Sequence, residues 1–228
     1  MRRVVVTGIG LLTTLGNDKD LTWTNLINGK SGIKKVDQFD VSDLPCKIAG
    51  YISNNPDDKE YFNYLEHIDT RDIKRNDRFI QYGLVAAKMA IEDAGLSELT
   101  DEQKLSVGVS VGSGIGGINT FEKQHKRLMQ SPRKVSPYFI PTMISDIAAG
   151  QISIRHGFKG INYGIVSACA TGSHAIGDAY RQIKYGDADI IISGGSEASI
   201  SPMSIAGFAN MKALTKNPDI NTACRPFD

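Results

Sequence analysis

The feature that most constrains the fold is an alternation of short apolar runs, rich in β-branched residues, with segments whose apolar residues recur every three or four positions. The short runs predict strands, and the spaced segments predict helices. We expect strands at residues 3–6, 105–111, 161–166 and 189–193. We expect helices at residues 19–28, 77–94, 118–130, 145–156 and directly after Cys169. Continuous apolar strands separated by helices indicate an α/β fold, with helices on both faces of a sheet.

The composition indicates a globular chain and excludes several classes of function. With 228 residues, of which 41% are hydrophobic, the chain is long enough for one large domain or two small ones. The net charge of +1 gives no general attraction to nucleic acid or to an anionic membrane, so an acidic partner must meet a local basic patch. No run approaches the roughly 18 apolar residues of a membrane helix, and the first residues lack the apolar stretch of a signal peptide. We therefore expect a soluble, cytoplasmic protein.

The three cysteines, Cys46, Cys169 and Cys224, have neither the spacing of a metal site nor the even number of a disulfide framework. We therefore expect a reducing compartment and no bound metal. The segment 37–75 is mostly polar and weakly periodic, and we expect it to be a long excursion at the surface.

Cys169 is the best candidate for a reactive atom. It lies between the predicted strand 161–166 and a helix of small residues that ends at Gly186. A thiol attacks as the thiolate, which the unpaired backbone N–H groups of a helix N-terminus favour. Burial opposes this effect, and inert core packing is the alternative, but the layout favours a nucleophile. His174 lies about 140° around the helix axis from the thiol, so we do not expect it to act as the base.

The segment 112–117, Gly-Ser-Gly-Ile-Gly-Gly, follows a predicted strand and has the G-x-G-x-x-G spacing of dinucleotide-binding turns. No second strand ending in an acid follows about 20 residues later. Nucleotide binding stays an alternative. The favoured interpretation is that these glycines permit close backbone approach and positive φ beside a pocket.

Six segments, in order along essentially the whole chain, carry a resemblance to a known family: residues 2–10, 79–83, 112–117, 132–137, 167–172 and 185–189. Together they resemble the condensing enzymes of the β-ketoacyl-acyl carrier protein synthase II type. The resemblance implies the thiolase-like fold, an α/β fold in which two similar halves stack as five αβαβα layers and act as a homodimer. Residues 1–228 would form the layered αβα amino-terminal half, without its last strand and without the carboxy-terminal half.

The resemblance implies an acyltransferase of fatty acid elongation. Cys169 would take the acyl group from acyl carrier protein as a thioester. Decarboxylative Claisen condensation with malonyl-carrier protein would then give a 3-oxoacyl chain and carbon dioxide. No resident cofactor is implied, because phosphopantetheine arrives on the carrier. The family's two histidines, its lysine and its gating phenylalanine lie beyond residue 228, so we expect this chain alone to be inactive in full condensation.

The resemblance also implies roles for other residues. Ile115 and Phe208 resemble acyl-pocket residues, and Phe139 resembles the residue that closes the pocket across the dimer. Their alternative role is ordinary core packing, since an acyl tunnel uses the same apolar burial, about 0.8 kcal/mol per methylene. The acidic carrier would bind a basic set for which solvated surface charge is the alternative: Arg71, Lys74, Arg75, Arg133, Lys134 and Lys212.

Two other functions stay open. The chain could be a non-catalytic fragment, or a pairing half that associates with a complementary chain, because an unpaired sheet edge and an uncovered apolar face favour association. A thiolase is the third interpretation, and the basic positions count against it. Thiol protease and α/β-hydrolase chemistry is disfavoured, because neither a Cys-His pairing motif nor G-x-S-x-G appears.

Overall fold

The chain forms two compact units. The computed structural model describes residues 2–53, 62–63 and 66–226. Unit 1 comprises Met1–Gly10 and Tyr64–Ala198, and unit 2 comprises Leu11–Asn63 and Ser199–Asp228. The residue ranges of all four expected strands, and of all but one of the expected helices, belong to unit 1.

The centre of unit 1 is a pair of parallel strands, β3 (Val107–Gly112) and β4 (Ile190–Gly195), close to two of the predicted ranges. Their register pairs Gly112 with Gly195, so the carboxyl ends of both strands lie at one edge. Every residue of β3 is buried, as expected for an apolar strand covered on both faces.

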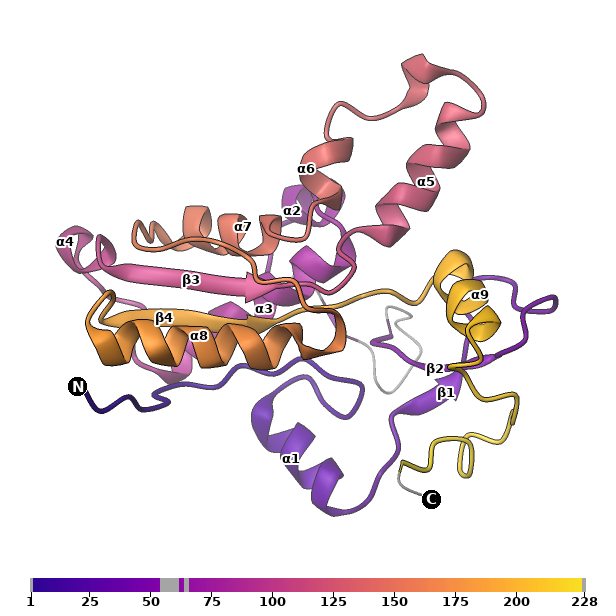
Figure 1. Cartoon of the computed structure of the whole chain (residues 1–228), viewed down its shortest axis with the longest axis horizontal. Helices are drawn as coiled ribbons and strands as arrows, with labels where there is room; N and C mark the ends of the chain where they lie inside the picture. The colour runs from indigo at the N-terminus through magenta and orange to yellow at the C-terminus, as the bar shows by residue number, and fades with distance from the viewer. Residues whose placement is uncertain (1, 54–61, 64–65, 227–228) are drawn as a thin grey trace. The chain divides into compact units, whose positions relative to one another are not determined.

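Three long helices cover this pair. α8 (Thr171–Tyr185) contacts both strands, and α7 (Ile147–His156) contacts β3. α3 (Arg78–Asp93) contacts α7 and β4. In Figure 1 the strand pair lies between α7 and α8. The predicted helices 77–94, 145–156 and the one after Cys169 are confirmed.

The long helices begin and end at residues that the sequence marks. Asp77 precedes α3, and its Oδ1 accepts a hydrogen bond from Phe79 N at 3.4 Å. Gly95, with φ of 69°, follows the end of α3, and Gly186, with φ of 91°, ends α8. A side-chain acceptor at the start and a left-handed glycine at the end satisfy backbone groups that a helix leaves unpaired.

The prediction of a strand at residues 3–6 is wrong, because that segment joins no ladder among the described residues. Val5 and Val6 are exposed, and the chain next to them lies against α3 instead. A Cβ on Gly8 would come within 2.2 Å of Ala90 O, and one on Gly10 within 1.9 Å of Ala86 O. Close backbone contact with a helix therefore replaces strand pairing here.

The prediction of a strand at residues 161–166 is correct only at its start. One parallel bridge joins Asn162 to Val109, with Val109 N donating to Ile161 O at 2.7 Å. Beyond this bridge the segment still runs beside β3 without forming a ladder, since a Cβ on Gly164 would lie 3.4 Å from Val111 O and 2.9 Å from Asp146 Cα.

An arm of unit 1 extends away from the strand pair in Figure 1. It consists of α5 (Ile118–Leu128), the 3-10 turn η2 (Pro132–Lys134) and α6 (Phe139–Met143), and α5 confirms the helix predicted at 118–130. Buried Asp77 fixes its base, because Asp77 Oδ2 accepts from Thr120 N at 2.9 Å and from Thr120 Oγ1 at 2.7 Å. One carboxylate therefore serves the first turns of both α3 and α5.

Two further helices of unit 1, α2 (Thr70–Arg75) and α4 (Asp101–Lys104), were not predicted. They are too short for an apolar repeat to show in the sequence. Within the described part of the chain, no helix has the length and apolar character needed to span a bilayer.

Unit 2 contains α1 (Lys19–Ile27), α9 (Pro202–Asn210) and an antiparallel pair, β1 (Ile33–Lys35) with β2 (Ile48–Gly50). The helix predicted at 19–28 is thereby confirmed. The apolar core of unit 2 includes Cys46, Tyr51 and Ile205. The expectation of a surface excursion over 37–75 is therefore partly wrong, because buried residues and a strand lie inside that segment. Residues 54–61 and 64–65 of it lie outside the described residues.

Candidate functional site

Cys169 lies in a single 3-10 turn, η3 (Ala168–Ala170), directly before α8, and its side chain is exposed. Ala168 has φ of 52°, an unusual backbone for an alanine, and Ser167 N donates to Thr171 Oγ1 at 2.9 Å. Cys169 thus lies two residues before a 15-residue helix, whose first backbone N–H groups lack intrahelical acceptors and favour negative charge nearby. The helix predicted after Cys169 is present, whereas the strand predicted before it is present only at its start, and the catalytic role of Cys169 stays a prediction.

Three glycines bring backbones together beside Cys169. A Cβ on Gly195 would lie 2.9 Å from Gly172 Cα, and a Cβ on Gly112 would lie 2.0 Å from Ile165 O. The end of β4 therefore meets the first turn of α8 backbone to backbone, and the end of β3 meets the backbone of Ile165, in the loop before Cys169. Cys169 is held at the carboxyl edge of the strand pair, the edge at which open α/β sheets bind ligands.

The glycine-rich turn 112–117 lies against the residue before Cys169. A Cβ on Gly114 would lie 3.0 Å from Ala168 O, and Gly116 has φ of 77°. The interpretation that these glycines serve close approach and positive φ is confirmed at both positions.

Glu197, which the sequence analysis missed, fixes this turn. Its Oε1 accepts from Ser113 Oγ at 3.1 Å, and its Oε2 accepts from Ile115 N at 3.1 Å. Ser113 is buried, and its Oγ in turn accepts from Gly116 N at 3.0 Å. The signal that could have revealed Glu197 is its position just after a predicted strand, at the same carboxyl edge.

His174 makes a hydrogen bond of 2.7 Å between its Nδ1 and Ser167 Oγ. Its partner is thus a hydroxyl of the loop before η3. This contact agrees with the expectation that His174 is not the base for Cys169, and gives it a part in holding that loop.

The three predicted acyl-pocket residues lie in different elements. Ile115 is in the turn beside Ala168, with its side chain exposed. Phe139 begins α6, where its ring centroid lies 6.5 Å from that of Phe121. Phe208 lies in α9 of unit 2 and is 39% exposed. The structure brings Ile115 to the Cys169 loop, and the pocket roles of all three residues stay predictions.

The predicted basic set is also spread over several elements. Arg71, Lys74 and Arg75 are exposed on α2, Arg133 and Lys134 are exposed in η2, and Lys212 is exposed in unit 2. Lys74 and Arg75 line a cavity of about 190 Å³ together with Lys123 of α5, a cation that the sequence analysis did not include. Unit 1 therefore has a cluster of cations where α2 meets the arm.

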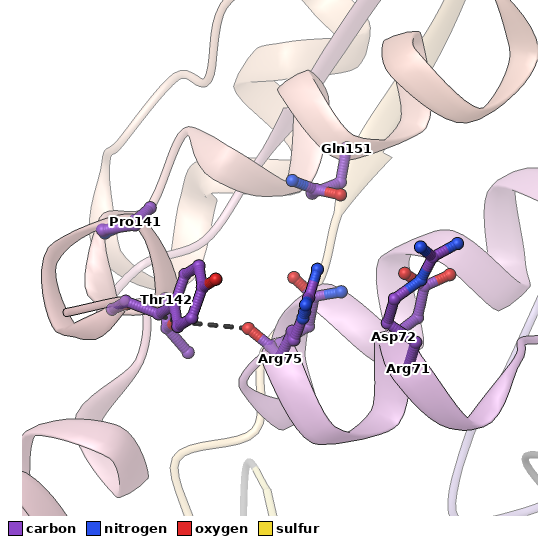
Figure 2. A pocket seen from close by; sticks show the side chains of 8 residues that line it. Arg71, Asp72, Arg75, Pro141, Thr142 and Gln151 are labelled. Atoms are coloured by element: carbon purple, nitrogen blue, oxygen red, sulfur yellow. Dashed lines mark hydrogen bonds between the residues drawn. The ribbon is translucent and has the colours of Figure 1, made fainter. Parts of the chain in front are cut away.

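A second cavity, of about 310 Å³, lies between α2, α6 and α7 (Figure 2). Arg71 and Arg75 line it from α2, Tyr138 and Thr142 from the arm, and Gln151 from α7. The Arg75 guanidinium lies 5.4 Å from the centroid of the Tyr138 ring. Asp72 lines the same cavity, so its wall carries a carboxylate as well as two guanidinium groups and an amide.

Comparison with known proteins gives a consistent result. The family described as the N-terminal domain of β-ketoacyl synthase matches residues 1–228. The 3-oxoacyl-[acyl-carrier-protein] synthase 2 of Staphylococcus aureus (strain N315) is 48% identical over 227 residues, 99% of this chain and 53% of that protein. The synthase of the same name from Rhizobium meliloti (strain 1021) is 43% identical and is 55% covered. The chain spans about half the length of the curated relatives that it matches.

Solved structures agree with the fold. A β-ketoacyl synthase from Burkholderia phymatum STM815 superposes with a TM-score of 0.83 at 26% identity, over 100% of this chain and 55% of that one. A type II polyketide ketosynthase, solved with its acyl-carrier protein, superposes with a TM-score of 0.77 at 27% identity, over 95% and 50%. The expected α/β thiolase-like fold, covering the amino-terminal half, is confirmed.

Proposed function

Since this chain belongs to the β-ketoacyl synthase family through its amino-terminal domain, we propose that it supplies the nucleophile of a 3-oxoacyl-[acyl-carrier-protein] synthase of fatty acid elongation. The observation that carries the proposal is the exposed Cys169 at the start of α8, beside the glycine-rich turn. The relatives named above, at 43–48% identity, support this substrate class.

The first half-reaction is acyl transfer to Cys169. The thiolate attacks the carbonyl carbon of the acyl thioester, and a tetrahedral oxyanion forms that the Cys169 backbone N–H stabilises. The carbon–sulfur bond to phosphopantetheine then breaks, the carrier thiol takes up a proton, and the acyl group stays on Cys169.

The second half-reaction is decarboxylative condensation. Malonyl-carrier protein loses carbon dioxide, and the resulting carbanion attacks the acyl thioester, which releases Cys169 and yields 3-oxoacyl-carrier protein. The family resemblance assigns the groups for this step to positions after residue 228. This chain contributes the acyl thioester, and Ile115, Phe139 and Phe208 are its candidate pocket residues.

The carrier protein binds the basic set through its acidic surface. Arg71, Lys74 and Arg75 of α2 carry the main contact, and η2 and Lys212 extend it. Such charges raise the association rate and fix the orientation of the partner. The protein needs no resident cofactor, works in the cytoplasm and forms a homodimer across which Phe139 closes the pocket.

A pairing half is the second candidate, because large apolar side chains of α8 are exposed. Ile176 is 55% exposed, Tyr180 45% and Tyr185 61%. Exposed apolar surface of this kind favours association with another protein surface. A chain that binds a complementary half yet never acquires an acyl group on Cys169 would support this candidate over the first.

A condensation assay with the full-length protein tests the proposed function. We expect acyl-carrier and malonyl-carrier proteins to give 3-oxoacyl-carrier protein and carbon dioxide, and Cys169→Ser to lower product formation by at least about 100-fold. Cys224→Ser is the matched control, because Cys224 is also an exposed cysteine, and we expect it to retain activity. Equal product from Cys169→Ser and the unsubstituted protein would overturn the proposal.

A further inference from the structure

Helix α2 is held in place by contacts with neighbouring helices. It has only six residues, and an isolated helix of that length is not stable in water. Gln81 of α3 donates through Nε2 to Ile73 O at 3.0 Å and to Asn76 O at 2.8 Å. Thr142 Oγ1 of α6 donates to Arg75 O at 3.2 Å (Figure 2). The direction in which α2 presents its side chains is therefore set by α3 and α6.

Two acids accompany the cations of α2. Asp69 caps the helix, with its Oδ1 accepting from Arg71 N at 2.9 Å, and Asp72 lies in the first turn. The Asp72 side chain is 23% exposed and lines the larger cavity beside Arg71 and Arg75. An aspartate three residues before an arginine on a helix can pair with it, so Asp72 is a potential partner for Arg75.

Arg155 of α7 holds both acids instead. Its Nη2 contacts Asp72 Oδ2 directly and lies 3.9 Å from Asp69 Oδ2. The Arg155 side chain is only 25% exposed, so water and salt screen this pair less than a pair on an open surface. Among the described residues, no acid forms a salt bridge with Arg71, Lys74 or Arg75.

We propose that Arg155 is a positioning residue for carrier binding: by pairing with Asp72, it keeps Arg71 and Arg75 available to an acidic partner. This inference rests on the proposed function, because it assumes that α2 meets the carrier. Without Arg155, Asp72 loses the cation that it pairs with and can pair with a cation of α2 instead, of which Arg75 is three residues away. The carrier would then meet one exposed cation fewer.

The charge that α2 presents to a partner depends on Arg155. With Arg155 present, Asp72 is neutralised and α2 presents three cations. Without it, one of these cations is drawn to Asp72, and the face presents an effective charge of two. Because association between oppositely charged surfaces depends steeply on local charge and is screened by salt, the effect must appear in the rate and shrink at high ionic strength.

Association of holo acyl carrier protein with the full-length protein, measured by stopped-flow at low and high salt, tests the inference. We expect Arg155→Met to lower the low-salt association rate about three- to ten-fold, with a smaller loss at high salt. Adding Asp72→Asn to Arg155→Met should restore the rate, because no anion remains to capture Arg71 and Arg75. Lys88→Met removes one cation from a pair with Glu92 on α3, 3.8 Å apart, and should leave the rate unchanged.

The outcomes separate this inference from the proposed function. If Arg75→Glu leaves association unchanged, α2 does not meet the carrier and the docking proposal fails. If Arg75→Glu slows association but Arg155→Met does not, only the role of Arg155 is overturned. A double variant that stays as slow as Arg155→Met would likewise overturn it, because the effect would then come from a displaced helix and not from Asp72.

Discussion

Cys169 owes its position to residues that have no side chain. Gly172 and Gly195 meet backbone to backbone, so the first turn of α8 lies directly on the end of β4. A Cβ on Gly195 would lie 2.9 Å from Gly172 Cα and must displace one of the two backbones, because backbone atoms cannot rotate away. The geometry of the nucleophile is therefore sensitive to the smallest possible substitution nearby.

The prediction at this scale is that Gly195→Ala destabilises the protein by about 1–3 kcal/mol and slows alkylation of Cys169 by iodoacetamide. The added Cβ would lie 2.9 Å from Gly172 Cα. Gly177→Ala is the control in α8, because a Cβ there meets no atom within 4 Å. It should stabilise the protein by about 0.5–1 kcal/mol in urea unfolding and leave the alkylation rate unchanged. Equal unfolding free energies for the two variants would refute the close-contact explanation.

The sequence suggested a role for Cys169, but it did not reveal the contacts of the residues that fix the loops and helices around the site. The sequence around Cys169 predicts a nucleophile near a helix start, because the apolar run and the small-residue helix are local patterns. Glu197 acts through Ser113 and Ile115, more than 80 residues away in the chain, so its position after a predicted strand indicates the edge at which it lies but not its partners. The pairing of Arg155 with Asp72 is hidden for the same reason.

At the scale of elements, helices were easier to predict than strands. α3 has a capping aspartate, an apolar repeat and a terminal glycine within its own sequence. A strand needs a partner that the sequence does not name. Residues 3–6 are apolar but find α3 as their neighbour, and residues 161–166 pair with β3 at a single bridge. The apolar residues of these two segments thus indicated contact with another element, but not whether that element is a strand or a helix.

The last turn of α7 shows burial prevailing over the helix dipole. A helix C-terminus favours a protonated histidine, yet burial lowers the pKa of His156 below its ordinary value of 6.5, and the nearby Arg155 guanidinium adds to the effect. The His156 ring stacks on Phe158, with ring centroids 5.5 Å apart. His156 is therefore neutral in the folded protein at pH values where the unfolded chain binds a proton.

This difference predicts that stability falls with acid. Above pH 6.5 both states are neutral at His156 and the full stability is present. As the pH falls below 6.5, the unfolded state takes up a proton first, so the free energy of unfolding decreases until the folded-state pKa is reached. His156→Phe, which keeps an aromatic ring beside Phe158, should flatten this decrease in urea unfolding curves between about pH 7 and 5. Burial also lowers the pKa of His67, so some slope should remain.

If the free energy of unfolding of His156→Phe falls with pH as steeply as that of the unsubstituted protein, His156 is not the source of the acid sensitivity. His156→Gln is the companion variant, since it removes the titrating ring without adding apolar surface. Both variants should flatten the curve to a similar extent, because both remove the same proton-binding group.

At the scale of the whole molecule, the elements of unit 1 converge on one edge. At this edge lie the carboxyl ends of β3 and β4, the start of α8, the glycine-rich turn and Glu197. A cluster of cations lies in the same unit, where α2 meets the arm. The fold class was predictable, because strand and helix patterns alternate along the sequence. The division into two units was not, since the core of unit 2 joins Cys46 and Tyr51 to Ile205 from a distant part of the chain.

The central claim is that Cys169 accepts an acyl group from a carrier-bound thioester. Peptide mass spectrometry after incubation with an isotope-labelled acyl-carrier protein measures this directly. We predict a labelled acyl adduct on the peptide that contains Cys169, formed without malonyl-carrier protein and removed by hydroxylamine, with Cys224 unlabelled although it is also exposed. An unmodified Cys169, or equal labelling of Cys169 and Cys224, would contradict the account.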